Sequence, residues 1–263
     1  MKESLTDHKE LSRGCQLCQQ GKWLCIFLTY KCNAHCHFCP APFTDDQIRS
    51  EYGNQKEKII SYLYHNDFNG ISFSGGDPFI VYDRLLDWLT YFKKRLPHYY
   101  YWVYTNGLAV DRAKLARLVE EGMDEIRFNI AATGYLSDEI FERIKIAREL
   151  FPFVSIEIPS IKQDYGMLVK ALPKLDRIGV DYLNLHDLIL MESDYRSSHE
   201  PAEAFLLNKT MPVRYAISSL QNTKDIIDLA TSKGFRFKIN HCSMQKKELQ
   251  MNQRDLKMTG MDQ

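Results

Sequence analysis

The sequence has neither an excess of charge of one sign nor a long apolar run. Its 34 Lys and Arg residues balance 34 Asp and Glu residues, so the formal net charge is zero and gives no argument for binding nucleic acid or an acidic membrane. No apolar stretch approaches a membrane span, and the Met-Lys-Glu-Ser start lacks the apolar core of a signal peptide. Repeats, low-complexity segments and obvious linkers are also lacking. These absences predict an ordinary globular protein of one large or two small domains.

Cysteine is moderately abundant, but its number and placement do not suit a disulfide scaffold. The chain has 263 residues and seven cysteines, an odd number that crowds toward the N-terminus. Cys32, Cys36 and Cys39 follow the spacing C-x3-C-x2-C. Three thiolates on one tight loop can hold three irons of a [4Fe–4S] cluster and leave the fourth iron open to a ligand. The alternative is zinc bound by Cys36 and Cys39 with His35 or His37.

A second motif, Ser74-Gly75-Gly76-Asp77 followed by proline, comes directly after a short apolar strand at residues 70–73. Two glycines at the carboxyl end of a strand let a ligand approach the backbone closely. An ordinary strand-to-helix turn would use the same residues, with Asp77 as the helix cap and Pro78 at the first helical position.

The remaining sequence alternates between apolar strands and amphipathic helices, which predicts an α/β fold with parallel strands joined by crossovers. Six to eight such units form a partial or near-complete (β/α) barrel over residues 23–243. Residues 1–22 are read as a cysteine-containing N-terminal segment without a packed element, and residues 244–263 as a polar C-terminal tail. A long loop is expected over 191–211. Strands are predicted at 23–30, 70–74, 100–105, 125–130, 154–158, 182–186, 213–217 and 235–240; helices at 45–65, 81–94, 111–121, 137–150, 164–178 and 222–233.

The strands themselves alternate between apolar and polar side chains, so one face of the sheet is predicted to be polar. The outer helices must bury the apolar face, which turns the polar face into the barrel lumen. On this reading the lumen is a binding cavity rather than a filled core. Its cationic groups outnumber its carboxylates, which suggests an anionic substrate group. The polar set comprises Glu125, Arg127, Asn129, Glu157, Asn184 and His186, with Arg214, Arg236 and Lys238 from the late strands.

The two motifs together resemble those of the radical SAM enzyme superfamily. Cys32, Cys36 and Cys39 match the family's cluster motif, including the aromatic Phe38 before the last cysteine. The second motif matches the family's GGE-type sequence, with Asp77 where Glu is commoner. The resemblance covers roughly residues 23–188. It implies a [4Fe–4S] cluster whose open iron chelates S-adenosylmethionine, and reductive cleavage of that cofactor to methionine and a 5′-deoxyadenosyl radical that abstracts hydrogen from a polar substrate.

The resemblance also implies roles for individual residues and for partners. Arg127, Glu157 and His186 are the predicted catalytic residues. A small-molecule, peptide or protein substrate and a flavodoxin- or ferredoxin-type reductant are implied, in a reducing cytoplasm. The family's adenine motif on the fifth strand is matched only loosely, by residues 156–159. The predicted cofactor-binding residues are Phe38, Ser74, Gly75, Gly76, Asp77, Asn129, Ile158 and Asn184.

Four cysteines lie outside the cluster motif and suggest a second metal. Cys15, Cys18 and Cys242, closed by Cys25 or His241, would hold zinc or an auxiliary iron–sulfur cluster. Alternatively, Cys25 and Cys242 are small buried hydrophobic residues. If the first and last strands are parallel, Cys18 and Cys242 start at opposite ends of the barrel. The N-terminal segment must then fold back along the barrel, or the last strand must run antiparallel.

Three other functions stay open at the level of sequence. An activase of a glycyl-radical enzyme is compatible with the small size of the chain. A non-catalytic iron–sulfur or zinc-binding protein would use the same cysteines. A zinc-stabilised barrel that binds a sugar or nucleotide is the third. The open iron and the Gly-Gly-Asp-Pro turn favour the enzyme over the two non-catalytic alternatives.

Overall fold

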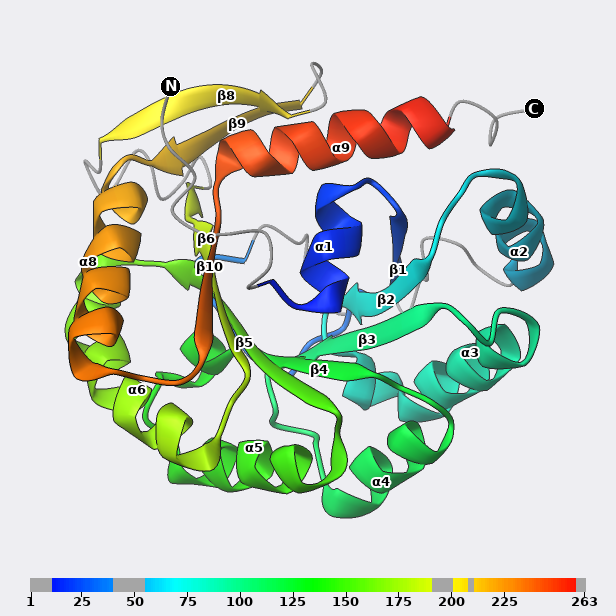
Figure 1. The fold of residues 1–263 in the computed structure, drawn as a ribbon, viewed down its shortest axis with the longest axis horizontal. Helices are drawn as coiled ribbons and strands as arrows, with labels where there is room; N and C mark the ends of the chain where they lie inside the picture. Colours follow the sequence, from blue (N-terminus) through cyan, green and yellow to red (C-terminus); the bar gives the residue numbers. More distant parts are fainter. Residues whose placement is uncertain (1–10, 40–54, 191–200, 208–210, 259–263) are drawn as a thin grey trace.

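The computed structural model describes residues 11–39, 55–190, 201–207 and 211–258. Its main feature is a curved, seven-stranded parallel sheet with the order β1-β2-β3-β4-β5-β6-β10, surrounded on its convex side by helices (Figure 1). The edge strands β1 and β10 do not pair with each other. The predicted partial (β/α) barrel is therefore confirmed, and it is open on the side between these two strands.

The barrel strands agree closely with the predicted ones except at the end of the chain. They are β1 (Trp23–Thr29), β2 (Gly70–Gly75), β3 (Tyr100–Thr105), β4 (Glu125–Phe128), β5 (Phe153–Ser160), β6 (Tyr182–Asp187) and β10 (Lys238–Cys242). The outer helices are α2 (Lys56–His65), α3 (Tyr82–Arg95), α4 (Arg112–Glu120), α5 (Asp138–Leu150), α6 (Tyr165–Ile178) and α8 (Ser218–Lys233). Short 3-10 helices follow three strands: η2 (Pro78–Val81), η3 (Ile130–Thr133) and η4 (Lys162–Asp164).

A separate three-stranded antiparallel sheet lies beside the barrel and corrects two predictions. It consists of β7 (Ile189–Leu190), β8 (Ala202–Leu207) and β9 (Met211–Ala216), in the order β7-β9-β8. The predicted strand at 213–217 is thus not a barrel strand, and the long loop expected over 191–211 contains β8. Residues 191–200 and 208–210 of that loop, and residues 45–54 of the first predicted helix, lie outside the described residues.

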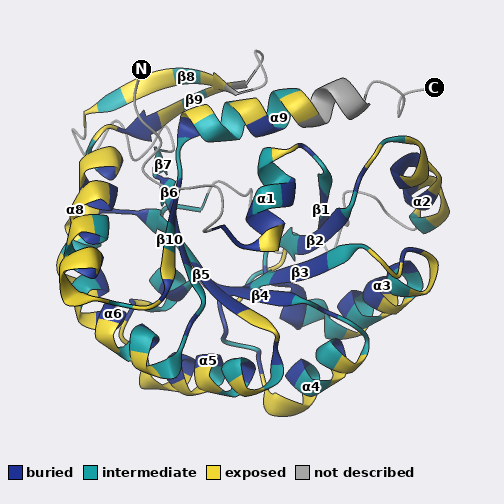
Figure 2. Ribbon diagram, viewed as in Figure 1, coloured by how far each residue is buried: buried dark blue, intermediate teal, exposed yellow. Residues whose placement is uncertain are grey.

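The apolar residues of the alternating strands lie together in the hydrophobic core, as predicted. Ile126 and Phe128 of β4 and Ile156 of β5 are completely or almost completely buried in one hydrophobic core between the sheet and the outer helices (Figure 2). Their polar neighbours in sequence point to the concave side. The helices α3 and α6 contribute Leu85 and Leu172 to the same core. Burial of this apolar face fixes the strand register, because a shift by one residue would exchange the two faces.

The N-terminal segment contains a packed helix, contrary to the prediction. Helix α1 (Arg13–Gln19) lies inside the curve of the sheet, where Figure 1 shows it on the concave side. Ser12 caps it by accepting a hydrogen bond from the Cys15 backbone N–H at 3.2 Å. Leu17 is 1% exposed. A Cβ on Gly14 would lie 2.4 Å from the Arg127 guanidinium, so a glycine is required where this helix meets the sheet. Sequence alone missed the helix because seven residues give too little periodicity.

The C-terminal segment also packs on the barrel. Helix α9 (Met244–Met258) runs across the gap between the two edge strands (Figure 1) and contacts α1 and β8. Asp187 anchors its start: its carboxylate lies 2.9 Å from His241 Nε2 and accepts a hydrogen bond from the Met244 backbone N–H at 2.9 Å. The domain boundaries at residues 22 and 243 stay predictions. Within the described residues, every helix is too short or too polar to cross a membrane.

Candidate functional site

The two sequence motifs meet at the carboxyl ends of β1 and β2. The Gly76 backbone N–H donates to the Thr29 carbonyl at 2.7 Å, and the Asp77 N–H donates to the Lys31 carbonyl at 3.0 Å. These bonds continue the parallel pairing of the two strands past Gly75. The loop that carries the three cysteines therefore begins directly on the Gly-Gly-Asp-Pro turn.

The two glycines are required because the cysteine loop lies against them. A Cβ on Gly76 would be 2.0 Å from the Lys31 carbonyl oxygen, and one on Gly75 would be 2.0 Å from the Thr29 carbonyl oxygen. Gly75 also has φ = 125°, a conformation that side-chain-bearing residues rarely adopt. The close approach that the sequence predicted is thus made in this structure by the chain itself. A cofactor-binding role for Ser74, Gly75 and Gly76 stays a prediction.

The Asp77 carboxylate faces the protein interior rather than the open end of the barrel. It accepts hydrogen bonds from the backbone N–H groups of Phe79 at 2.9 Å and Asn106 at 2.8 Å, and from the Thr105 hydroxyl at 2.9 Å. It is completely buried, and this burial raises its pKa although the three donors oppose the shift. Asp77 therefore fixes the end of β2 against the end of β3, and its predicted cofactor-binding role stays a prediction.

Asn106, which follows β3, contacts the cysteine loop and was missed by the sequence analysis. Its side-chain amide donates to Asn33 Oδ1 at 2.7 Å and lies 3.5 Å from Cys32 Sγ. The signal was present as Thr105-Asn106-Gly107, a polar and glycine-containing turn at the end of a buried strand. Hydrogen bonds from amides to a cysteine sulfur stabilise a thiolate and tune an iron–sulfur cluster.

The donor set of the cysteine loop fits an iron–sulfur cluster. Burial and the nearby sulfurs of Cys39 and Cys32 raise the pKa of Cys36 to about 11, so the three sulfurs are close enough to repel one another as thiolates. None of the seven cysteines, all of which are described, forms a disulfide. His35 and His37 are exposed beside them. Within the described ranges, no three His, Cys, Asp or Glu residues gather around one metal ion. A cluster takes each thiolate on a different iron, whereas zinc takes all its ligands around one point.

The interior of the barrel is charged, as predicted, but its charges neutralise one another. Arg127 donates to Glu157 Oε2 at 2.8 Å, to Glu125 Oε2 at 3.2 Å and to the Ser12 hydroxyl of the α1 cap at 3.1 Å. Ser155 donates to the other Glu125 oxygen at 2.6 Å. Arg127 is only 3% exposed, and its guanidinium stacks between the rings of Trp102 and Tyr104. With its donors engaged in this way, Arg127 is a structural centre of the lumen. Its predicted catalytic role stays a prediction.

Glu157 joins this network to His186 at the end of β6. Burial alone would raise the pKa of Glu157, but Arg127 and His186 outweigh it and hold the pKa at about 2. The Glu157 carboxylate lies 2.8 Å from His186 Nε2. Burial and Lys247 would lower the pKa of His186, but Glu157 and the Cys242 thiol raise it to about 9. Glu157 and His186 therefore form a charged pair that faces the open side of the barrel.

The other predicted cofactor residues lie in different parts of the barrel. Asn129 follows β4 and caps η3 by accepting from the Ala132 N–H at 3.2 Å, so it does lie at the carboxyl rim. Ile158 is completely buried in the hydrophobic core, which leaves only its backbone for a cofactor. Asn184 lies deeper, where it donates to Glu157 at 2.9 Å and accepts from the Cys15 thiol at 3.5 Å. Phe38 packs edge-on against His37, and its predicted role stays untested.

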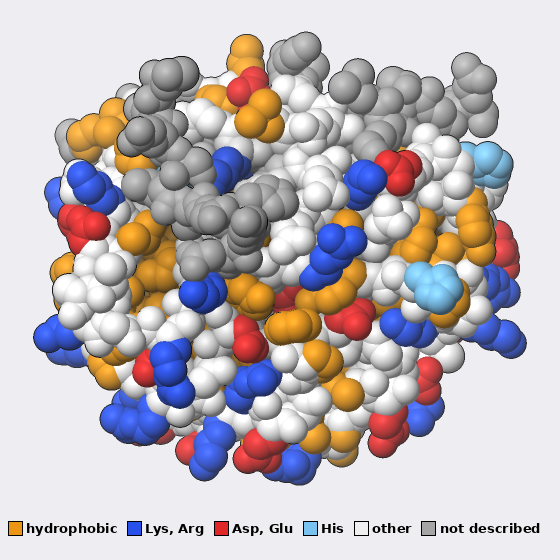
Figure 3. All heavy atoms as spheres, viewed as in Figure 1, with side chains coloured by type: hydrophobic (Ala, Val, Ile, Leu, Met, Phe, Trp, Pro, Cys, Tyr) orange, Lys and Arg blue, Asp and Glu red, His pale blue; other side chains and the backbone are white. Residues whose placement is uncertain are grey.

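Three cations that the sequence placed in the lumen lie elsewhere. Arg214 belongs to β9 of the small sheet. Arg236 precedes β10, is largely exposed, and hydrogen-bonds the Asp176 carboxylate through its backbone N–H at 2.7 Å. Lys238 is exposed at the first position of β10. The prediction of a cationic lumen for an anionic substrate is therefore wrong. On the face seen in Figure 3, basic and acidic side chains are likewise intermixed, in keeping with the zero net charge.

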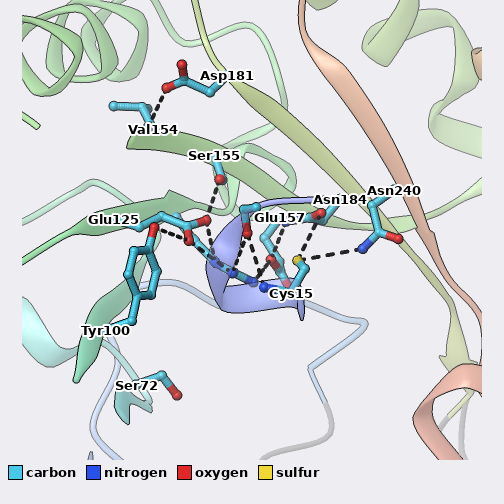
Figure 4. Close-up of polar contacts among 12 residues, drawn as sticks. Cys15, Ser72, Tyr100, Glu125, Val154, Ser155, Glu157, Asp181, Asn184 and Asn240 are labelled. Atoms are coloured by element: carbon cyan, nitrogen blue, oxygen red, sulfur yellow. Dashed lines mark hydrogen bonds and ion pairs between the residues drawn. The ribbon is translucent and has the colours of Figure 1, made fainter. Parts of the chain in front are cut away.

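The residues predicted to hold a second metal are brought close together because α1 folds back into the barrel and β10 is parallel to β6. Cys15 lies between the amide groups of Asn184 and Asn240 (Figure 4). Burial raises the pKa of Cys15 to about 12 and that of Cys18 well above its usual value. Cys242 pairs in register with His186, and contact with that imidazole, together with Lys247, lowers its pKa despite its burial.

Comparison with known proteins agrees with this geometry. A protein named "Putative glycyl-radical enzyme activating enzyme" from Methanocaldococcus jannaschii is 27% identical over 257 residues, which cover 93% of this chain and 67% of the relative. Among solved structures, SuiB of Streptococcus suis bound to S-adenosylmethionine superimposes with a TM-score of 0.59 at 13% identity over 84% of this chain. The chain spans half the length of SuiB.

Methylornithine synthase is similar in fold over a larger share of both chains. The superposition has a TM-score of 0.59 at 15% identity and covers 96% of this chain and 81% of the synthase. At such identities these structures establish the shared fold alone. The model of the family described as "Radical SAM superfamily" matches residues 26–172, which include both motifs and more than half of the chain. The chain therefore belongs to the radical SAM superfamily.

Proposed function

We propose that this protein is an enzyme that cleaves S-adenosylmethionine reductively and uses the resulting radical to abstract hydrogen from a polar substrate. The observation that carries the proposal is the docking of the cysteine loop onto the Gly-Gly-Asp-Pro turn through the Gly76 and Asp77 backbone N–H groups. A [4Fe–4S] cluster on Cys32, Cys36 and Cys39 would supply the electron that cleaves the sulfonium bond of the bound cofactor.

The residues of the chain then have distinct parts in this proposal. Gly75 and Gly76 offer backbone without side chains next to the cluster loop, where the methionine end of the cofactor would lie. Asp77 holds that turn against β3. Asn106 orients the loop through Asn33 and donates toward the Cys32 sulfur. His186 and Glu157 lie 2.8 Å apart and join β6 to β5 through an ion pair inside the barrel.

The decisive experiment is product analysis after anaerobic reconstitution with ferrous iron and sulfide. Dithionite and S-adenosylmethionine are then added, and 5′-deoxyadenosine and methionine are quantified by chromatography. We expect both products in equal amounts from the wild-type protein and neither from the Cys36→Ser variant. Absence of both products from a wild-type sample that carries a full complement of iron and sulfide would overturn the proposal.

A second, more specific candidate is the activation of a glycyl-radical enzyme, which is favoured by the name of the relative from Methanocaldococcus jannaschii and its similarity over 93% of this chain. In that case the substrate is a glycine residue of a protein partner. A flavodoxin- or ferredoxin-type reductant would supply the electron, and seven cysteines without a disulfide suit a reducing cytoplasm.

This candidate is tested by electron paramagnetic resonance. The reconstituted protein, S-adenosylmethionine and dithionite are incubated with a purified glycyl-radical enzyme from the same genome. A doublet that collapses when the partner's glycine is deuterated at Cα supports activation. Formation of 5′-deoxyadenosine that is indifferent to the partner, without a protein radical, would point to a small-molecule substrate instead.

A further inference from the structure

The open side of the barrel contains a cavity of about 470 Å³ whose walls carry four of the seven cysteines. These are Cys15, Cys18, Cys25 and Cys242. The other three cysteines are those of the radical SAM loop. The chain thus places its cysteines in two groups, one at the carboxyl ends of β1 and β2 and one between the edge strands.

Two elements at the start of the described chain and one near its end bring these four thiols together. Cys15 and Cys18 come from α1, which folds back into the barrel. Cys25 alternates with Trp23 and Phe27 on the lumen side of β1, and all three line the cavity. Cys242 is the last residue of β10, paired in register with His186. Cys18 lies close enough to Cys15 and Cys242 for both of them to raise its pKa. Packing alone does not require α1 and the two edge strands β1 and β10 to direct four thiols into one cavity.

Two polar groups from the sheet face the Cys15 sulfur in this cavity. The side-chain amide of Asn240 donates to the sulfur at 3.7 Å, and the Arg127 guanidinium lies beside it. The Cys15 thiol in turn donates to Asn184 Oδ1 at 3.5 Å. An N–H donor and a positive charge beside a cysteine sulfur favour its thiolate form, which is the form that ligates a metal.

The number and placement of the thiols suit an iron–sulfur cluster. Such a cluster takes each cysteine on a different iron, so its ligands surround a space, and four thiols on the walls of one cavity do so. Zinc would instead take its four ligands at about 2.3 Å around one point. His241, the alternative fourth ligand, instead pairs with Asp187 outside the cavity.

We propose that Cys15, Cys18, Cys25 and Cys242 hold a second iron–sulfur cluster in the open side of the barrel. With four cysteine ligands this cluster has no open iron, so it would exchange single electrons rather than bind S-adenosylmethionine. It would also connect α1, β1 and β10 by covalent ligation, and thereby stabilise a seven-residue helix that is too short to persist by itself. The proposal is independent of the reaction at the first cluster.

The test uses the full chain with the first site removed. The variant Cys32→Ser/Cys36→Ser/Cys39→Ser is reconstituted anaerobically with ferrous iron and sulfide, desalted, and analysed for iron, sulfide and its Mössbauer spectrum. We expect the wild-type protein to bind two clusters, and the triple variant to keep about half of the wild-type iron in a spectrum typical of an iron–sulfur cluster. A triple variant without iron, or one that carries a single zinc ion instead, overturns the proposal.

Variants of the second site complete the experiment. Cys18→Ser and Cys25→Ser, each added to the triple variant, should remove the remaining iron. Gln19→Ala, which alters the same cavity wall without removing a thiol, should not. Iron content that is unchanged by Cys18→Ser and Cys25→Ser together contradicts the assignment. Because the triple variant retains all four proposed ligands, it decides the matter even if the added substitutions prevent folding. If the triple variant binds iron but the wild-type protein forms no 5′-deoxyadenosine, only the proposed reaction is contradicted.

Discussion

The carboxyl rim of the sheet and the interior of the barrel both carry polar side chains, but the two regions use them in opposite ways. At the rim, the cysteine loop and the Gly-Gly-Asp-Pro turn are connected by backbone hydrogen bonds, which leaves the cysteines for ligation. In the interior, Arg127, Glu125 and Glu157 bind one another and the cap of α1. The comparison teaches that a polar strand face predicts where charge lies, but not whether that charge is available to a ligand.

The largest expected effect is at the rim. Cys36→Ser should reduce the formation of 5′-deoxyadenosine to the background of the reaction mixture, because one iron of the cluster loses its ligand. The unfolding midpoint of the metal-free protein should change little, since Cys36 is only partly buried. His37→Ala, on the same loop and exposed, is the matched control and should retain activity. Equal losses in both variants would argue for a zinc site that includes the histidine.

The next largest effect is expected in the interior. Arg127→Met leaves Glu125 buried without its counter-charge and Glu157 with His186 alone, which should lower the free energy of unfolding by about 3–5 kcal/mol. Urea unfolding of the metal-free protein measures this loss. Adding Glu125→Gln should recover most of it, because the uncompensated charge is then gone. If Arg127→Met instead leaves stability unchanged and weakens binding of S-adenosylmethionine, the Arg127 side chain binds the cofactor rather than stabilising the interior.

A backbone substitution at the junction of the two motifs should have an intermediate effect. Gly76→Ala places a Cβ 2.0 Å from the Lys31 carbonyl oxygen, so the cysteine loop must move away from its turn. We expect a loss of about 2 kcal/mol in unfolding free energy and weaker binding of S-adenosylmethionine by calorimetry on the reconstituted protein. Gly166→Ala, in α6 with open space around it, should be neutral or slightly stabilising. Similar stability in both variants would contradict the described docking.

The smallest effect is expected for a cation that the sequence analysis had placed in the lumen. Arg236→Ala removes an exposed side chain near Asp176, and exposed ion pairs contribute at most about 1 kcal/mol. Stability should change within this limit, and the rate of 5′-deoxyadenosine formation should equal that of the wild-type protein. A clear loss of activity would show that Arg236 contributes to the functional site, and would contradict its position outside the barrel.

Local patterns in the sequence predicted much of the fold. The alternation in residues 125–130 and 154–158 gave both the strands and their orientation, because burying one apolar face allows a single register. The rim was predictable from motifs, since ligand spacing and the glycines lie within short segments. Asn106 was missed because a polar residue after a strand is common. The cofactor contact of Ile158 stays a prediction for its backbone alone, because its side chain belongs to the core.

The sequence by itself determined the radical SAM motifs, the parallel strands and the polar lumen, all of which depend on residues that are close together in the chain. Only the tertiary structure decided what fills that lumen. The contacts of Cys15 with Asn184 and Asn240 join residues 169 and 225 positions apart, and no periodicity of a single segment encodes them. Folding α1 back into the barrel adds the Ser12 hydroxyl to the partners of Arg127 and brings Cys15 and Cys18 to Cys242, because long-range packing determines which polar groups meet.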